Sequence, residues 1–471
     1  MQSPYITRIQ VDGMHGQFNV DIQLKSGLNV LYGQNGRGKT TLLHLIANTL
    51  ELDFDRFKYL RFELIDISVS NGSVIKIRPE KDESGILVSL DGNELQWRED
   101  GSENSNLHRR ILRSVLGNRP NYLPAFRSIL ERVRNDSFLG ALTPSQQQEF
   151  DKIRIAEARV MREDGVLPVR YPSRTEGPSL TAQKTLQCRQ WFGGFSPIIR
   201  YPSIGEVTDK LETEFRDAEL ETAAFERRMF SDFFLGTMRA LLSGQDLPSE
   251  QEVETLLQRI RTAVVEEESN PEPYEPHGPQ IIHQLAQAVD SVAAEAARAG
   301  AAERRVLRLY ADMLEQRGRE RRSSFEKIKK FETAVNKFLD NKTLHIAEGR
   351  RYAPRSRSTY VESENYQQYP LTSLSSGERQ VLTMLFSASR LSAMSGSFLI
   401  DEPELSLHID WQRIVLAELM AQAGGRQIIA CTHSPEVGAD HIDAVQVFNP
   451  IPYRRNNNQE VVSDSLLDDS L

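Results

Sequence analysis

The first segment with recognisable chemistry is glycine-rich and lies at residues 33–40, with the spacing Gly-x4-Gly-Lys-Thr. An apolar run at residues 28–32 precedes it, and a helix-forming run at residues 41–46 follows it. In this strand, loop and helix context, the backbone amides of a glycine-rich loop converge on phosphate oxygens. The segment therefore predicts a loop that binds the phosphates of a nucleotide.

Individual roles follow from the side chains in and directly after this loop. Lys39 is placed to reach the β- and γ-phosphate oxygens, and the hydroxyl group of Thr40 is a suitable ligand for Mg²⁺. The candidate nucleotide-binding residues of this segment are Asn35, Gly36, Gly38, Lys39, Thr40 and Thr41.

A second motif, Leu-Ser-Ser-Gly-Glu-Arg-Gln, lies at residues 374–380. Ser375 and Ser376 precede an uninterrupted helix-forming stretch at residues 380–386, and serine is a preferred residue at the N-terminal cap of a helix. The motif therefore predicts a capped helix at this position.

Two adjacent acids, Asp401 and Glu402, end an apolar run that is typical of a buried parallel strand. Asp401 is expected to hold Mg²⁺, and Glu402 is expected to polarise the attacking water. The plainer interpretation is a strand that ends in solvated acids. The Ser-Ser-Gly-Glu helix immediately upstream disfavours that interpretation.

Another buried strand is predicted at residues 427–431, and Thr432, His433 and Ser434 follow at its end. A single histidine is usually structural. The position of His433 at a strand terminus, beside the other motifs, favours a contact with the γ-phosphate or with water.

In this order, these residues resemble the ATP-binding-cassette (ABC) class of ATPases. The resemblance identifies five elements: Walker A at 33–40, the signature at 374–380, Walker B at 398–402, a D-loop at 405–408 and the switch histidine His433. It implies ATP and Mg²⁺ as cofactors and ATP hydrolysis as the activity, with Mg²⁺ held by Thr40 and Asp401 and with Glu402 and His433 as catalytic residues.

The resemblance also implies an oligomer. In the ABC class, the signature helix of one subunit contacts the γ-phosphate held by Walker A of another, and the helix dipole and free amides at its N-terminus suit that contact. One chain carries one set of motifs, so two ATP sites require two chains. We expect a homodimer or higher oligomer, in which the signature contributes Ser375, Ser376, Gly377 and Glu378.

The predicted fold class is α/β: an ABC-type ATPase head, a mixed sheet flanked by helices, with a large inserted α-helical and partly coiled-coil domain. The 333 residues from Thr41 to Ser373 exceed what a compact cassette needs. The resemblance itself covers roughly the first 80 and the last 130 residues. We divide the chain into the N-terminal part of the head at 1–200, the helical insertion at 201–340, the C-terminal part of the head at 341–450 and an acidic tail, expected to be disordered, at 451–471.

Within the insertion, residues 204–242 and 250–268 have charge-rich helical composition, and the proline-rich segment 270–276 breaks the series. A three-four alternation of apolar residues follows, which is typical of a coiled-coil seam. Gly300 and Gly318 are positions where that helix can bend. The seam consists of Ile282, Leu285, Val289, Val292, Ala296, Ala299, Val306, Tyr310 and Met313.

Charge is segregated in the insertion: residues 206–226 carry eight acids and two bases, whereas residues 304–330 carry ten bases and four acids. One interpretation is that these helices neutralise each other or are solvated faces. The other is a positive platform for DNA or for an acidic, DNA-mimicking protein. The centre of that platform would be Arg317, Arg319, Arg321 and Arg322, and another basic stretch lies at 350–357.

Composition limits the classes of protein to which the chain can belong. The 471 residues contain no run of eighteen apolar residues and no N-terminal signal, so we expect a cytoplasmic protein with no membrane partner. Two cysteines, Cys188 and Cys431, exclude a disulfide framework. The formal net charge is -9, so any contact with nucleic acid must be local.

The variants Ser-Ser-Gly-Glu-Arg-Gln and Asp-Glu-Pro-Glu-Leu-Ser-Leu-His resemble the soluble branch that includes RecF, the SMC and Rad50 proteins and the OLD-like ATPases of phage defence. His-Gly-Gln-Phe at residues 15–18 also resembles the OLD-like group. OLD nucleases append a nuclease domain after the switch histidine, but only 38 residues follow His433. Residues 122–127 look like the crossing to the helical lobe, yet glutamine is absent there, so no residue is assigned that role.

In the length of the chain, the helical insertion and the short segment after His433, the sequence resembles the ATPase subunit of the two-gene PARIS anti-phage systems. That resemblance implies a homo-oligomer that holds a separate nuclease effector until a viral trigger protein appears. The ATPase subunits of Septu systems and of some retrons share the motifs. The alternative is a RecF- or Rad50-like repair ATPase that clamps DNA when ATP drives dimerisation; a transporter ATPase is disfavoured by the long insertion.

Overall fold

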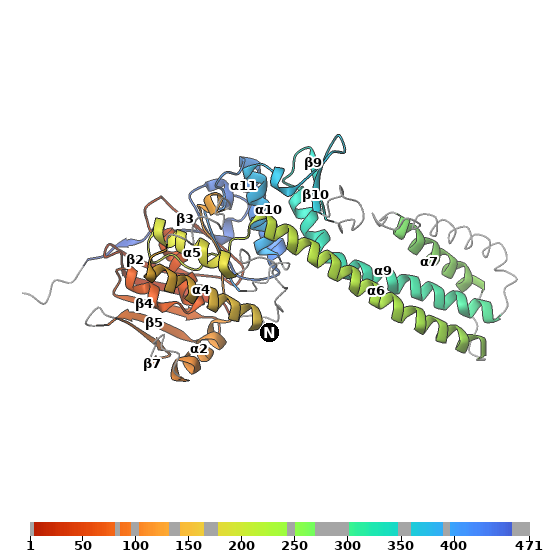
Figure 1. The fold of residues 1–471 in the computed structure, drawn as a ribbon, viewed down its shortest axis with the longest axis horizontal. Helices are drawn as coiled ribbons and strands as arrows, with labels where there is room; N and C mark the ends of the chain where they lie inside the picture. The colour runs from red at the N-terminus through yellow and green to blue at the C-terminus, as the bar shows by residue number, and fades with distance from the viewer. Residues whose placement is uncertain are drawn as a thin grey trace, which may run out of the picture. The chain divides into compact units, whose positions relative to one another are not determined.

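The structure is a computed structural model, and contacts divide it into two compact units. The first, Met1–Ile204 with Ser375–Leu471, is called the head below, and the second, Gly205–Leu374, is called the helical unit. The sequence predicts residues 341–374 as part of the head, whereas these contacts group the described residues of that segment with the helices. The described residues are 4–80, 85–95, 103–130, 142–163, 178–242, 250–268, 301–346, 359–389 and 396–454 (Figure 1).

The centre of the head is a five-stranded sheet in which every pairing is parallel. Every residue of β12 (Phe398–Asp401) and β13 (Ile428–Thr432), two of its three inner strands, is buried, because a parallel sheet is covered on both faces. Both apolar runs predicted as buried strands are confirmed. In spatial order the strands are β14 (Val445–Val447), β3 (Leu28–Tyr32), β13 (Ile428–Thr432), β12 (Phe398–Asp401) and β8 (Asn121–Leu123).

Helix α1 (Lys39–Glu51) leaves β3 and packs on β12 and β13. Two further helices, α10 (Ser376–Ala388) and α11 (Ile409–Ala423), contact each other. Since the strands are parallel, the carboxyl ends of β3, β13, β12 and β8 meet at one edge of the sheet. Ligands of open α/β sheets bind at this edge.

A second sheet of the head is antiparallel and has seven strands. Its strand β4 alternates buried and half-buried positions, as expected when one face packs on the core. The sequence predicts a disordered tail from residue 451, but Ile451–Pro452 forms strand β15 and pairs with β2 (Phe18–Gln23). Residues 455–471 lie outside the described residues. The spatial order is β15, β2 (Phe18–Gln23), β1 (Ile6–Met14), β4 (Leu64–Val69), β5 (Val74–Pro79), β6 (Ile86–Leu90) and β7 (Asn93–Leu95).

The described head also contains further helices and single helical turns. Helices α4 (Pro144–Glu163) and α5 (Pro178–Phe192) pack against each other. The buried guanidinium of Arg200 pairs with Glu51, at the end of α1, and with Glu157 of α4. These two ion pairs link α1 to α4. The segments are η1 (Phe54–Tyr59), α2 (Glu103–Leu116), α3 (Arg127–Leu130), α4 (Pro144–Glu163), α5 (Pro178–Phe192), η5 (Pro435–Gly438) and η6 (Ile442–Ala444).

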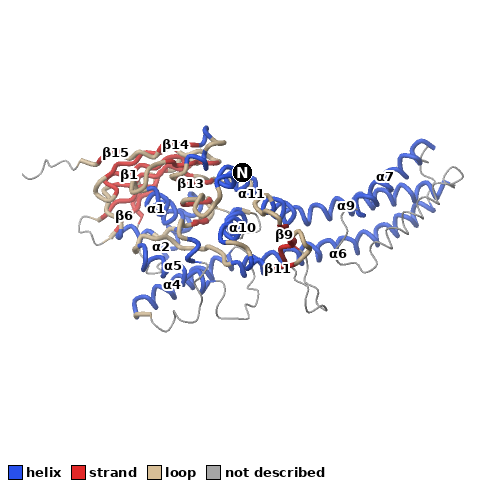
Figure 2. Tube along the Cα trace, turned by 90° about the horizontal axis from the view of Figure 1, so that it is seen from above, coloured by secondary structure: helices blue, strands red, loops and turns tan. Residues whose placement is uncertain are grey.

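The helical unit is built on α6 (Ile204–Leu242), α7 (Glu250–Glu268) and α9 (Ala301–Asn336), and the first two match the predicted helices. Figure 2 shows α6 and α9 side by side. Three contacts between them pair Phe215 with Phe325, Glu226 with Arg317 and Phe233 with Tyr310. Residue numbers rise along α6 as they fall along α9, so the two helices are antiparallel. A small sheet accompanies them, with the order β11 (Gln368–Tyr369), β10 (Thr359–Ser363) and β9 (Lys342–Ile346), followed by η4 (Leu371–Ser373).

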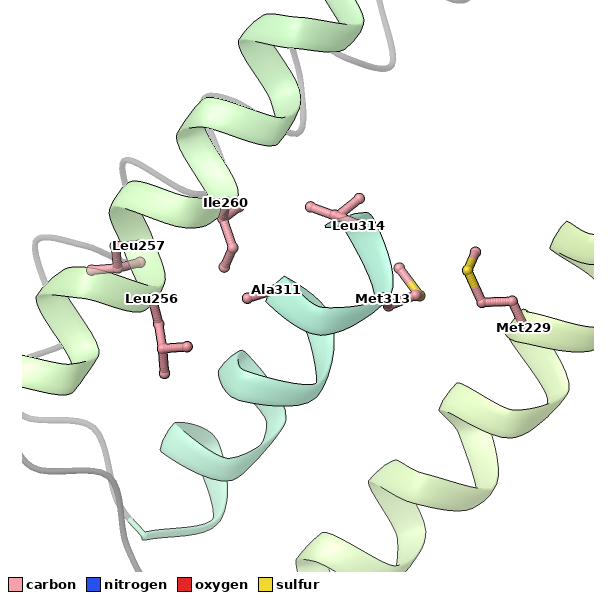
Figure 3. Packing of buried hydrophobic residues seen from close by; sticks show 7 residues of the cluster. All are labelled: Met229, Leu256, Leu257, Ile260, Ala311, Met313 and Leu314. Carbon is pink, nitrogen blue, oxygen red and sulfur yellow. The ribbon is translucent and has the colours of Figure 1, made fainter. Parts of the chain in front are cut away.

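The three helices share a hydrophobic core (Figure 3). Of the predicted coiled-coil seam, Met313 belongs to this core and Tyr310 packs against it, while the part at residues 282–299 lies outside the described residues. Helix α9 continues through Gly318. An α/β ATPase-type head with a long helical insertion is thus confirmed. The core residues are Met229, Leu256, Leu257, Ile260, Ala311, Met313 and Leu314.

Among the residues that the structure describes, no helix is both long enough and apolar enough to cross a membrane.

Candidate functional site

The glycine-rich loop connects the carboxyl end of β3 to the first turn of α1, as its sequence predicted. Gly36 and Gly38 have φ angles of 76° and 94°, in the left-handed region that favours glycine. A Cβ atom on Gly38 would lie 2.5 Å from Cε of Met14, and one on Gly33 would lie 2.7 Å from the carbonyl oxygen of Phe448. The path of the loop therefore requires glycine at these positions.

Lys39 is buried at the start of α1, and its ammonium group lies across the loop. Nζ donates to the carbonyl oxygens of Gly33 at 2.7 Å and of Gln34 at 3.0 Å. Asn35 and Gly36 are exposed on the same loop. The amides at a helix N-terminus together with a lysine ammonium form a binding site for phosphate oxygens.

Thr40 and Asp401 meet although 361 positions separate them in the sequence. The hydroxyl Oγ1 of Thr40 donates to Oδ2 of Asp401 at 2.7 Å. The other carboxylate oxygen, Oδ1, is buried without a hydrogen-bond partner in the described part of the chain. Burial raises the pKa of Asp401 to about 6. Hydroxyl and carboxylate oxygens are ligands that Mg²⁺ prefers, so this pair fits the ion.

Glu402 follows β12 and lies close to His433, which follows β13. The φ angle of Glu402 is 47°, which is unusual for a residue other than glycine. Its amide donates to the carbonyl oxygen of Cys431 at 2.8 Å. Nδ1 of His433 lies 3.6 Å from Oε1 of Glu402, and the two side chains are 44% and 26% exposed. The structure thus brings the two predicted catalytic side chains together where a ligand can reach them.

Glu404 was not singled out from the sequence, although it is the second glutamate of Asp-Glu-Pro-Glu. Its Oε1 accepts hydrogen bonds from the Thr432 hydroxyl at 2.6 Å and from the amides of His433 at 3.0 Å and Ser434 at 3.2 Å. The same oxygen lies 3.2 Å from Nδ1 of His433. Glu404 therefore holds the segment that carries His433.

His15 lies in the turn between β1 and β2, and its Nε2 is 2.8 Å from Oγ1 of Thr41. Burial lowers the pKa of His15, which favours the neutral imidazole. The contact places the turn of the His-Gly-Gln-Phe segment beside the first turn of α1. A residue noticed only for its resemblance to the OLD-like group thus contacts a candidate nucleotide-binding residue.

The signature motif forms the predicted cap. Ser375 is the N-cap of α10: its Oγ accepts from the amide of Glu378 at 3.3 Å, and Oε2 of Glu378 accepts from the amide of Ser375 at 2.7 Å. This reciprocal pair is a capping box. Ser375 and Ser376 are exposed, whereas Glu378 is buried. The carboxylate of Glu378 therefore serves the cap, and a direct contact between Glu378 and ATP stays a prediction.

Gly377 brings α10 against the predicted D-loop. A Cβ atom on Gly377 would lie 2.9 Å from the carbonyl oxygen of Ser406, which itself has a φ angle of 63°. Glycine is needed here because a Cβ atom at residue 377 would be too close to the backbone carbonyl group of Ser406. The signature helix and the predicted D-loop therefore lie directly against each other.

A phosphate-binding loop, a hydroxyl–carboxylate pair suited to Mg²⁺, a glutamate beside a histidine and a capped signature helix, all on one parallel sheet, define a P-loop ATPase of the ABC type. A family described as "AAA domain, putative AbiEii toxin, Type IV TA system" matches residues 28–440, and the chain belongs to this family. It is therefore an ATP-binding, ABC-like ATPase of a family linked to toxin and defence systems.

Solved structures with a similar arrangement share little sequence with this chain. An Smc head domain with an extended coiled coil from Pyrococcus furiosus is 12% identical, with a TM-score of 0.39 over 95% of this chain and 96% of that one. An Smc head with coiled coil and joint from Pyrococcus yayanosii is 15% identical, with a TM-score of 0.36 over 93% of each chain. The recombination mediator RecF is 12% identical, with a TM-score of 0.30 over 93% of this chain and 94% of that one.

No curated protein matches this chain in sequence.

Proposed function

We propose that this protein hydrolyses ATP and uses the cycle to act as the sensor and scaffold of an anti-phage defence system. In this proposal it holds a separate effector, a nuclease, and releases it when a viral trigger appears. The observation that carries the hydrolytic part is the convergence of Lys39, the Thr40–Asp401 pair and the Glu402–His433 pair at one edge of the sheet.

Each side chain has a distinct task in the hydrolysis. Lys39 stabilises the charge on the γ-phosphate oxygens, and Glu402 orients and polarises a water molecule. The water oxygen forms a bond to the γ-phosphorus while the bond to the β,γ-bridging oxygen breaks, and Glu402 accepts the proton. His433 contacts the γ-phosphate or this water. Mg²⁺, held by Thr40 and Asp401, would neutralise charge on the β- and γ-phosphate oxygens.

The oligomer is argued from the exposed end of α10. Ser375 and Ser376 are exposed at a helix N-terminus, whose amides and dipole attract a phosphate. We propose that they receive the γ-phosphate held by another copy, so that ATP bridges two chains in a homodimer or higher oligomer.

The defence role is supported by the family, whose description names a toxin of a type IV toxin–antitoxin system. The competing proposal is a RecF- or Rad50-like repair ATPase that clamps DNA. The two differ in what stimulates turnover and in what accompanies the protein. Copurification of a nuclease from the native host would favour defence, whereas stimulation of phosphate release by DNA alone would favour repair.

Hydrolysis itself is tested with purified full-length protein and Lys39→Ala. We expect the wild-type protein to release phosphate from ATP in the presence of Mg²⁺ and Lys39→Ala to lose ATP binding or turnover, because the cation that faces the transferred phosphate is removed. Phosphate release and ATP binding by calorimetry are the measurements. Equal turnover in the two proteins would reject Lys39 as the phosphate-binding lysine.

The basic segment of α9 is the candidate sensor of this proposal. Nε of Arg317 donates to Oε1 of Glu226 on α6 at 2.6 Å, which supports mutual neutralisation at that position. Arg319 and Arg322 are exposed on α9, as are the basic side chains near its end. Both interpretations of the segregated charge therefore stay open, and they differ in their response to charge reversal.

We expect the triple variant Arg319→Glu, Arg321→Glu and Arg322→Glu to lose the response to an acidic trigger or to DNA. Binding by the wild-type protein should also weaken steeply as salt is raised, because ion contacts with a polyanion release counterions. The measurement is trigger- or DNA-dependent phosphate release over a salt series, with native mass as the control for assembly. A response insensitive both to charge reversal and to salt would move the search to the acidic helices at 206–268.

A further inference from the structure

Arg127 is a fully buried arginine in the segment that follows β8. Its Nη1 donates to the carbonyl oxygens of Pro124 at 3.1 Å and Asp401 at 3.0 Å. Its Nη2 donates to those of Glu402 at 3.0 Å and Pro403 at 3.2 Å. The two terminal nitrogens of a guanidinium carry four N–H groups, so these four acceptors match them.

Three of the four acceptors are consecutive carbonyl groups, at residues 401–403, where the chain leaves β12. This turn includes the left-handed conformation of Glu402. Such a conformation persists only where the surroundings hold it, and strain of this kind clusters at functional sites. Arg127 binds the backbone on both sides of Glu402, so it supplies a restraint at the strained residue.

Arginine suits this contact better than lysine does. A guanidinium is a planar fork with donors in fixed directions, whereas an ammonium group offers three donors from one atom. Burial lowers the pKa of Arg127, whereas the acids Asp401, Glu402 and Glu404 act in the opposite direction and the carbonyl dipoles compensate the buried charge. A single side chain therefore links β8 to the turn after β12.

We propose that Arg127 is a positioning residue for ATP hydrolysis, which fixes the turn after β12 so that Glu402 faces the attacking water. The proposal rests on the hydrolytic role proposed above for Glu402. Arg127 acts through the backbone of Glu402, and it contacts neither nucleotide nor water in this account. Its removal should therefore lower kcat while ATP binding, which depends on the loop at 33–40, is retained.

The test uses full-length protein with Arg127→Lys, which keeps the charge, and Arg127→Gln, which keeps two N–H donors without it. We expect kcat to fall roughly 10- to 100-fold, as is typical when a supporting partner of a reacting group is changed. The Kd for ATP should stay near the wild-type value. Hydrogen exchange in the nucleotide-free protein should quicken in the peptide that covers residues 401–405, because the turn loses its restraint.

Arg189→Lys is the matched control. Arg189 is also a buried arginine of the head, with contacts to Ser196, Glu149 and Asp53 beyond the far end of α1. Arg189→Lys should lower thermal stability because, like the Arg127 variants, it removes hydrogen bonds of a buried guanidinium. It should leave kcat and the rate of hydrogen exchange at residues 401–405 unchanged. If both Arg127 variants fail to fold while Arg189→Lys folds, Arg127 is a structural residue and the proposal is wrong.

A double-mutant cycle with Glu402→Gln separates positioning from independent effects. Because Arg127 acts through Glu402, adding Arg127→Lys to Glu402→Gln should cause no further loss of residual turnover. Additive losses, an unchanged kcat in Arg127→Lys, or a parallel loss of ATP binding would each overturn the proposal. If Glu402→Gln itself hydrolyses ATP like wild type, the proposed role of Glu402 fails. In that case faster exchange at 401–405 would show only that Arg127 restrains the turn.

Discussion

Glu402→Gln should bind ATP with near-normal affinity and hydrolyse it roughly two to four orders of magnitude more slowly, the range found when a general base is removed. The amide keeps the size of the side chain but cannot accept the proton of the attacking water. The substituted side chain lies beside His433, where Oε1 of Glu402 is 3.6 Å from Nδ1. The substitution therefore changes no residue of the phosphate-binding loop or of the Thr40–Asp401 pair. Single-turnover phosphate release and calorimetric ATP binding are the two measurements.

The matched control is Glu436→Gln. Glu436 pairs with Arg413 near the surface of the same head and follows the same strand β13 as His433 does. Glu436→Gln should hydrolyse ATP at the wild-type rate. A loss of turnover found only in Glu402→Gln then cannot be attributed to the removal of any carboxylate from the head. Near-normal turnover in Glu402→Gln would reject Glu402 as the residue that activates water.

Ser376→Arg should abolish ATP-driven assembly and, with it, most of the hydrolysis. Ser376 is exposed in the first turn of α10, where a long cationic side chain would obstruct the approach of a bound phosphate and oppose the helix dipole. Moving an assembly equilibrium from 1:99 to 99:1 requires about 5.5 kcal/mol of differential binding, which ATP at the closed interface has to supply. Blocking that contact removes the differential binding while each chain still binds ATP.

Assembly is best measured in the Glu402→Gln background, where bound ATP persists. Native mass with and without ATP should show a shift in Glu402→Gln alone and none when Ser376→Arg is added. Thr372→Arg adds the same charge at an exposed position just before the capped helix and should leave the shift intact. Full activity of Ser376→Arg at ordinary ATP affinity would disprove the composite site.

Mixing Ser376→Arg with Lys39→Ala offers a sharper version of this test. A mixed dimer combines the intact loop of the first chain with the intact signature of the second, so one complete site forms from two inactive proteins. Partial recovery of phosphate release on mixing is therefore expected, and a site built within one chain would show none.

Several elements could be predicted because their signals are local. The strands β12 and β13 are short apolar runs that end in Asp401 and Thr432, and burial on both faces of a parallel sheet favours that composition. The helices α6 and α7 have the predicted bounds, since turn-forming and helix-breaking residues surround charge-rich helical sequence. The cap at Ser375 follows from a spacing of three residues to Glu378, which one helical turn brings together.

Other elements could not be predicted because their partners are remote and carry no motif. The short strand β15 forms only through pairing with β2, and its own two residues give no strand pattern. Glu404 takes its role from three donors at and just after the end of β13, and a second glutamate after Walker B does not reveal them. The described residues within 341–374 group with the helices because β9 packs against α9 and pairs with β10, which in turn pairs with β11.

The sequence by itself determined the nucleotide chemistry. Glycines at fixed spacing, a lysine, a hydroxyl group and two acids after an apolar strand each act through the local geometry of a loop or a strand end. Only the tertiary structure decided what supports that chemistry. Arg127 meets the carbonyl oxygen of Asp401 across 274 positions of sequence, because β8 and β12 are neighbours in a parallel sheet. Backbone carbonyl groups are the same in every residue, so no pattern of side chains could have indicated that they are its partners.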